Sequence, residues 1–211
     1  MNRFTSSTLA LLASLLFAAA SASAGDEPAA QYFVKKNHDQ IMETLRLAPS
    51  PARDAKLDDA MGKLIDFDEV VARAFGEPCP QGVAKCTNHW AEFTPKQQVE
   101  VRDLLKKLVQ KQYRKNLQKT LTYELKMGGT KPLAGLIRVR AEAASTTDAR
   151  EAAVRIDYFV TDVRGQRVVD VALEGSSMTK NYYEQFHKML VRPEQGFAHV
   201  VKKIKEKLSA D

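Results

Sequence analysis

The spacing of the apolar residues changes at Thr120, and this change constrains the fold more than any other feature of the sequence. Before it, apolar side chains recur at helical spacing through residues 28–47 and 95–118, as in amphipathic helices with one buried face. After it, residues 121–127 alternate between apolar and polar, as in a strand with one covered face. Helical spacing returns after residue 181. The sequence therefore predicts an α+β fold in which helices come both before and after the sheet along the chain.

Four segments have the alternating composition of strands, and they are residues 121–127, 136–140, 154–160 and 168–173. The first is expected to stop at Gly128 and Gly129, and the last follows a turn around Gly165. Consecutive strands joined by short turns favour an antiparallel sheet. We therefore expect a four-stranded antiparallel sheet packed against several helices.

Helix boundaries are marked by capping residues. Thr94, Pro95 and Gln97 place a capping hydroxyl, a first-turn proline and a reciprocal amide at the start of the long helix. Asp66 is expected to cap the start of a shorter helix in the same way, and Gly76 is expected to end that helix, because glycine is common at helix C-termini. These signals predict both helix starts.

Residues 1–24 have the order of parts of a Sec signal peptide. Arg3 precedes an apolar run over residues 9–20 that is too short to span a bilayer, and Ala22-Ser23-Ala24 forms a small-residue cleavage pattern. No cysteine directly follows this run, so a lipoprotein anchor is not indicated. We predict cleavage after Ala24, which leaves residues 25–211 as a single exported domain.

The formal net charge is +6 and falls by one when Arg3 is removed with the signal peptide. Inside a cell such basicity would favour nucleic acid as a partner. An exported chain seldom meets nucleic acid, so anionic lipid or an acidic protein surface is the better interpretation. A basic surface that is simply solvated explains the charge equally well.

Cys79 and Cys86 are the two cysteines of the chain. In an oxidising compartment a close pair is most simply a disulfide, and closing so short a loop stabilises the fold by about 2–3 kcal/mol. A zinc site is not favoured because His89 is the one nearby additional ligand and such sites need three or four. We expect a structural disulfide.

Residues 168–186 combine a strand, a Gly-Ser turn and a helix, which are also the parts of a nucleophile elbow. That motif is G-x-S-x-G, whereas this chain has Thr179 in place of the second glycine. Glu184 and His187 would have to supply the acid and the base of a catalytic triad. Both lie on the helix that directly follows the turn, so too little chain remains to bring the acid and the base to the serine from separate strands. A serine hydrolase is therefore not favoured.

The remaining chemistry points away from catalysis. The four histidines are scattered and form no metal-binding pattern, and the carboxylate pairs lie at helix starts, where capping explains them. We predict no catalytic residue and no metal. Helical apolar stripes and one apolar sheet face remain. These apolar surfaces either pack together as an ordinary core or form the walls of a ligand pocket. Periodicity alone favours the ordinary core.

Residues 169–186 read VDVALEGSSMTKNYYEQF. This segment is similar to a D-V-x-x-E-G-x-S-(L/M) strand that runs into an N-Y-x-x-x-F helix, and so resembles the MlaC family of periplasmic phospholipid-binding proteins. Residues 65–70, and Trp90 followed by residues 94–97, are similar to two further family segments. The cysteine loop resembles an insertion, and the family's aromatic pair before the D-V strand is absent, with Arg167 and Val168 in its place.

The resemblance implies a periplasmic carrier that shuttles phospholipid between the outer membrane and an inner-membrane ABC transporter complex and so maintains outer-membrane lipid asymmetry. It implies an apolar pocket enclosed by the sheet and helices, bound phospholipid as cargo rather than a cofactor, and an outer-membrane lipoprotein complex as a second partner. Contact with a membrane surface would be transient. The candidate pocket-wall residues are Val101, Leu105, Leu108, Val171, Leu173, Tyr182 and Phe186.

Three alternatives stay open. The chain could carry another apolar lipid such as a hopanoid, it could be a periplasmic adaptor with a fully packed core, or it could be an esterase. For a phospholipid we expect little specific headgroup contact, with the phosphate at the pocket mouth near lysine and arginine.

Overall fold

The computed structural model describes residues 26–163 and 165–210, so the predicted signal peptide lies outside the described residues. The chain begins with a helical block, followed by a short 3₁₀ turn at Thr120–Thr122. The helices of this block are α1 (Asp26–Leu45), α2 (Pro51–Leu64), α3 (Phe67–Ala74), α4 (His89–Glu92) and α5 (Pro95–Lys119). The last two helices of the chain are α6 (Met178–Leu190) and α7 (Gly196–Ser209).

The predicted helix starts are confirmed. Asp66 accepts a hydrogen bond of 3.0 Å from the backbone N–H of Glu69 at the start of α3. Thr94 and Gln97 form a reciprocal capping box at the start of α5, in which the Thr94 N–H donates to Gln97 Oε1 at 2.9 Å and the Gln97 N–H donates to Thr94 Oγ1 at 3.3 Å. These contacts satisfy N–H groups that have no partner inside a helix.

Gly76 follows α3 with a φ of +91°, a conformation that L side chains rarely adopt. A Cβ at this position would also collide with the carbonyl oxygen of Thr87. Only glycine fits here, because the chain turns sharply and the two backbone segments touch.

The sheet is antiparallel and follows the chain in the order β1-β2-β3-β4-β5. Its strands are β1 (Tyr123–Leu133), β2 (Leu136–Ser145), β3 (Val154–Thr161), β4 (Arg167–Leu173) and β5 (Ser176–Ser177). The α+β class is confirmed, but the predicted count of four strands is wrong. The fifth strand has two residues, which pair with Ala172 and Leu173 of β4, and a segment so short shows no period in a sequence.

The first strand is also longer than predicted. It passes through Gly128 and Gly129 and turns only after Leu133. The pairing with β2 shifts between Met127 and Thr130. An extra residue is accommodated there as a β-bulge, a common place for glycine inside a strand. The glycine pair therefore bends the strand instead of ending it.

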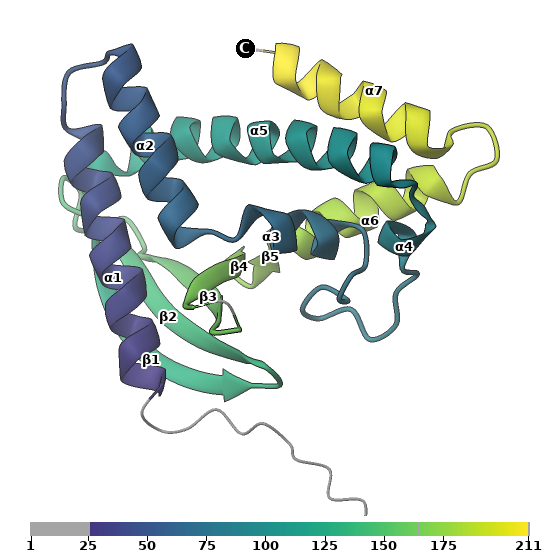
Figure 1. Cartoon of the computed structure of the whole chain (residues 1–211). Coiled ribbons are helices and arrows are strands. Elements are labelled where there is room, and N and C mark those ends of the chain that lie inside the picture. The colour runs from purple at the N-terminus through teal and green to yellow at the C-terminus, as the bar shows by residue number, and fades with distance from the viewer. Residues whose placement is uncertain (1–25, 164, 211) are drawn as a thin grey trace, which may run out of the picture.

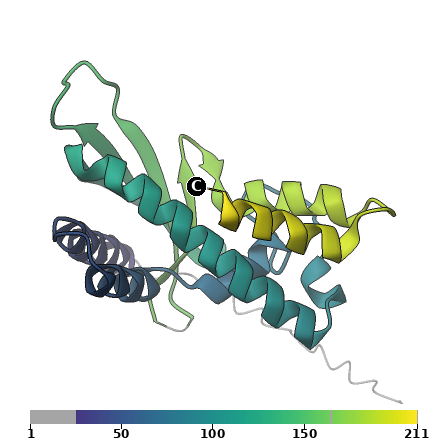
Figure 2. The same cartoon turned by 90° about the horizontal axis from the view of Figure 1, so that it is seen from above.

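The helices cover one face of the sheet (Figure 1). Helix α1 contacts β1 and β2, while α3 and α6 contact β4. Figure 2 shows α5 passing between the α1–α2 pair and the α6–α7 pair. The main core fills this space with side chains such as Ile41, Leu105, Val139 and Val160. A smaller cluster of Leu136, Phe159, Val169 and Ala172 lies apart from it.

Candidate functional site

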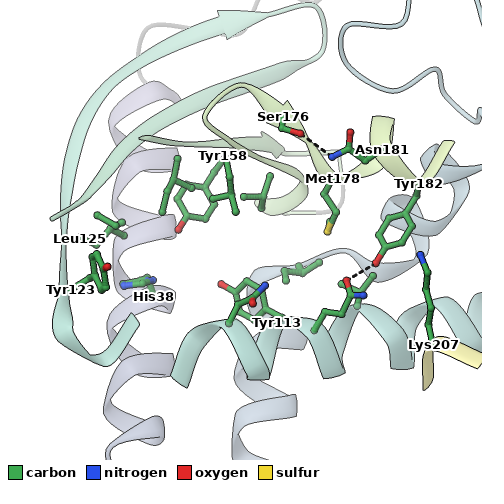
Figure 3. Close-up of a pocket in the computed structure, with 18 of the residues that line it drawn as sticks. His38, Tyr113, Tyr123, Leu125, Tyr158, Ser176, Met178, Asn181, Tyr182 and Lys207 are labelled. Atoms are coloured by element: carbon green, nitrogen blue, oxygen red, sulfur yellow. Dashed lines mark hydrogen bonds between the residues drawn. The ribbon is translucent and has the colours of Figure 1, made fainter. Parts of the chain in front are cut away.

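A cavity of about 470 Å³ lies between the sheet and the helices (Figure 3). Helix α5 forms one wall, the helix-facing side of the strands forms the opposite wall, and the β5–α6 junction and α7 form one end. The residues that line it include His38, Val109, Tyr113, Ala143, Ile156, Tyr158, Val171, Leu173, Tyr182, Gln185 and Lys207.

The lining is apolar because strand alternation directs every second side chain toward the helices. Ile156, Tyr158, Val171 and Leu173 share this side of β3 and β4, since Ile156 pairs with Leu173 and Tyr158 with Val171. Lysine 207 is the one Lys, Arg, Asp or Glu among the described lining residues. The cavity falls within the roughly 300–1,000 Å³ typical of ligand pockets, and such a surface suits an uncharged, apolar ligand.

The predicted enclosed pocket is not confirmed, because the cavity is partly open to solvent. Leu173 lines it and remains 49% exposed. Asn181 on α6 and Lys207 on α7 are further exposed residues of the lining. A ligand could therefore keep one end in water while the other end is covered.

The seven predicted wall residues separate into three groups. Val171, Leu173 and Tyr182 line the cavity. Leu108 and Phe186 instead line a second hollow of about 270 Å³ between α6 and α7, where Tyr182 also contributes. Lipid contact by any of them stays a prediction.

Val101 and Leu105 line neither hollow and are fully buried in the core. They lie on the first half of α5, whereas Val109 and Tyr113 on its second half reach the cavity. Helical spacing identifies which residues of α5 are buried, but it does not tell which of those buried residues line a cavity. The part of α5 that lines the cavity therefore lies later in the helix than Val101 and Leu105.

Sequence reasoning also missed the polar groups beside α1 and α5. His38, Tyr113 and Tyr158 all line the cavity (Figure 3). The buried Nδ1 of His38 has no hydrogen-bond partner among the described residues. Burial lowers the pKa of His38, and it raises the pKa of Tyr113 to about 12 and that of Tyr158 still further. These groups are therefore neutral near pH 7 and add polar atoms rather than charges to the cavity lining.

The Gly-Ser turn is a structural junction. Ser177 caps α6 by accepting from the backbone N–H of Lys180 at 3.1 Å, and its hydroxyl donates to Asp170 Oδ2 at 2.5 Å. Asp170 also accepts from the Thr179 N–H at 3.0 Å. Burial raises the pKa of the Asp170 carboxyl, although these hydrogen bonds act in the opposite direction. This network fastens the start of α6 to β4.

The predicted disulfide joins Cys79 and Cys86, with their Cα atoms 5.8 Å apart. Its loop is held against α6 because the Thr87 N–H donates to the Tyr183 hydroxyl at 2.8 Å. Nearby, His89 Nε2 lies 2.8 Å from His187 Nδ1. Within residues 26–163 and 165–210, no group of three or more His, Cys, Asp and Glu side chains could hold a metal, and no helix is long and apolar enough to cross a membrane.

Known proteins resemble this chain in fold and in sequence pattern. A search of curated proteins gives no match. Among solved structures, the phospholipid-binding protein from Ralstonia solanacearum in complex with a phospholipid is similar, with a TM-score of 0.69 and 22% sequence identity over 85% of this chain and 97% of that one. At this identity the likeness concerns the fold alone. The pattern of the MlaC protein family matches residues 35–206. The resemblance found in the sequence is thus confirmed, and the chain belongs to the MlaC family.

Proposed function

We propose that this protein is a periplasmic phospholipid carrier that holds acyl tails in the cavity between the sheet and α5. The observation that carries the proposal is an apolar cavity that is partly open to solvent and has a lysine as its one Lys, Arg, Asp or Glu in the described lining. The proposal is supported by membership of the MlaC family and by a fold shared with a Ralstonia solanacearum protein solved with a phospholipid.

The physical need for such a cavity follows from the cost of exposing acyl tails. Each methylene taken out of water contributes about 0.8 kcal/mol, so two tails cannot cross an aqueous compartment uncovered. The donor bilayer already covers those tails. A useful cavity must therefore match the bilayer without greatly exceeding it, or the lipid would not be released. A partly open cavity of about 470 Å³ meets this condition because it leaves part of the lipid in water.

The wider role that we propose is transport between the outer membrane and an inner-membrane ABC transporter complex, with an outer-membrane lipoprotein complex as the other partner. The signal peptide predicted in residues 1–24 supports the periplasmic location. Phospholipid is then cargo rather than a cofactor, and the Gly-Ser turn serves to hold α6 in place rather than to cleave an ester.

A substitution that fills the cavity tests the proposal. Ala143 lines the cavity, and the neighbouring Glu142 is exposed on the opposite side of β2. Phenylalanine at position 143 would displace about two methylenes of lipid at about 0.8 kcal/mol each, which corresponds to about tenfold in affinity. Uptake of fluorescent phospholipid from vesicles is expected to fall by this factor for Ala143→Phe.

The matched control is Glu142→Phe, which adds the same side chain on the side of β2 that faces away from the cavity. We expect its uptake to equal that of the unmodified protein, and circular dichroism and thermal unfolding would establish that both variants are folded. Equal uptake by both variants would show that the cavity does not hold the lipid. No uptake even by the unmodified protein would favour the adaptor.

A further inference from the structure

The second hollow adjoins the cavity. Tyr182, Gln185 and Lys207 line both spaces, and Figure 3 places Tyr182 and Lys207 at the end of the cavity nearest α7. Beyond them the hollow runs between α6 and α7 over an apolar floor of Leu108, Phe186 and Ile204. A ligand that fills the cavity would therefore have one end beside this hollow.

The hollow and the far end of the cavity differ in charge. Lys188, Arg192, Lys203 and Lys207 line the hollow, and its described lining contains no Asp or Glu. Lys203 and Lys207 are four residues apart on α7, so they lie on one face of that helix. The cavity end beside α1 has instead the neutral groups of His38, Tyr113 and Tyr158.

Among the described residues, one of these four cations forms an ion pair. Lys203 forms an ion pair of 2.8 Å with Glu206. Lys207 donates a hydrogen bond of 3.0 Å to Gln185, and an amide does not neutralise its charge. Cations above an apolar floor act on an anion more strongly than cations surrounded by water, because the floor excludes solvent on one side.

We propose that this hollow binds the phosphate of the lipid cargo, with Lys207 at the junction and Arg192 and Lys203 around it. This inference rests on the proposed function. A lysine binds phosphate as a point charge, and an arginine adds two parallel hydrogen bonds. The alcohol beyond the phosphate would extend into solvent, so the site selects for the phosphodiester and not for one headgroup.

The test compares two ligands that differ only in the phosphate-bearing headgroup. Dihexanoyl phosphatidylglycerol and dihexanoylglycerol are presented as monomers, so that no membrane surface takes part. The test variant is Lys207→Gln/Arg192→Gln. The control variant is Lys36→Gln/Lys202→Gln, which makes the same change in net charge at exposed positions outside both hollows.

We expect the preference for phosphatidylglycerol over dihexanoylglycerol to fall by about tenfold in the test variant, since a hydrogen bond to a charged group contributes about that much. The control variant should keep the full preference. Raising the salt concentration should weaken only the binding of the phosphatidylglycerol.

Three results would overturn the assignment. An unchanged preference would show that the phosphate lies elsewhere. An equal loss for both ligands would show that Lys207 and Arg192 support the fold. A loss confined to binding of phosphatidylglycerol vesicles, with monomer binding intact, would show that the cations hold a membrane surface. Failure of the unmodified protein to bind either ligand would instead contradict the carrier function itself.

Discussion

The hydroxyl of Ser177 donates a hydrogen bond of 2.5 Å to the carboxylate of Asp170, and both side chains are buried where β4 meets α6. Asp170 is fully inaccessible to solvent. A charge in such a place is tolerated only when its oxygens are hydrogen-bonded. The contact therefore fastens the helix that lines the cavity to the strand that forms its wall.

Removal of this hydroxyl should lower stability and leave lipid binding intact. In Ser177→Ala the buried carboxylate loses one partner, which costs about 1–3 kcal/mol and lowers the unfolding temperature by about 2–4 °C per kcal/mol. Ser176→Ala is the control, because Ser176 is exposed and accepts a bond from Asn181 alone. Thermal unfolding and phospholipid uptake would be measured together. If the unmodified protein had an esterase activity and the folded double variant Ser176→Ala/Ser177→Ala lost it, the esterase alternative would be supported.

Much of the fold was predictable because it depends on local chemistry. The capping box of Thr94 and Gln97 predicts the start of α5, and it forms as expected. The bulge at Gly128 was not predictable in this way, because a glycine pair has the same appearance at a turn and inside a bent strand. β5 is only two residues long, and its pairing depends on where β4 already lies.

The cavity was harder to locate for a related reason. Val101 and Val109 lie on the same helix and both belong to the core, yet of the two only Val109 also lines the cavity. The difference arises from the elements opposite each residue, which a helical period does not record. His38 gave no signal at all, because a single histidine on a helix is compatible with either surface or cavity.

Substitution of Gly76 should destabilise the fold strongly. Gly76→Ala places a Cβ against the Thr87 carbonyl and forces a φ of +91° on alanine, so we expect a loss of about 1–3 kcal/mol in the free energy of unfolding. Gly129→Ala is the matched control, since a Cβ there meets no heavy atom within 4 Å. Urea unfolding curves for both variants would test this, and equal curves would contradict the account.

The contact between His89 and His187 should make stability depend on pH. Burial, followed by the nearby His89, lowers the pKa of His187 from 6.5. The unfolded chain then binds more protons than the folded one below that pH. This contribution to stability is therefore complete above about pH 6.5 and is lost as the pH falls through the folded-state value.

The test is His187→Asn, whose amide can take the place of Nδ1 in the contact with His89 but does not titrate. Urea unfolding from about pH 7 to about pH 5 should show a smaller loss of stability for the variant than for the unmodified protein. The buried Asp170 makes stability depend on pH in the opposite direction. This effect is the same in the variant and in the unmodified protein, so it cancels when their stabilities are compared. Parallel curves would show that His187 does not contribute.

The unpaired nitrogen of His38 predicts that an apolar residue is tolerated in its place. His38→Leu removes a buried polar atom without a described partner, an arrangement that costs about 1–3 kcal/mol. We expect the unfolding temperature to stay the same or rise, and phospholipid uptake to be preserved. His199→Leu on α7, outside both hollows, is the control for added hydrophobicity. Lost uptake by a folded His38→Leu would show that the imidazole contacts the lipid.

The most direct test of the central claim is native mass spectrometry of the protein after periplasmic expression, followed by solvent extraction and lipid identification. The carrier account predicts a one-to-one mass increment that resolves to an intact diacyl phospholipid. A hopanoid in the extract would support a lipid-binding cavity but show that its cargo is not a phospholipid. An apo mass, together with failure of the same protein to take up phospholipid from vesicles, would contradict the account.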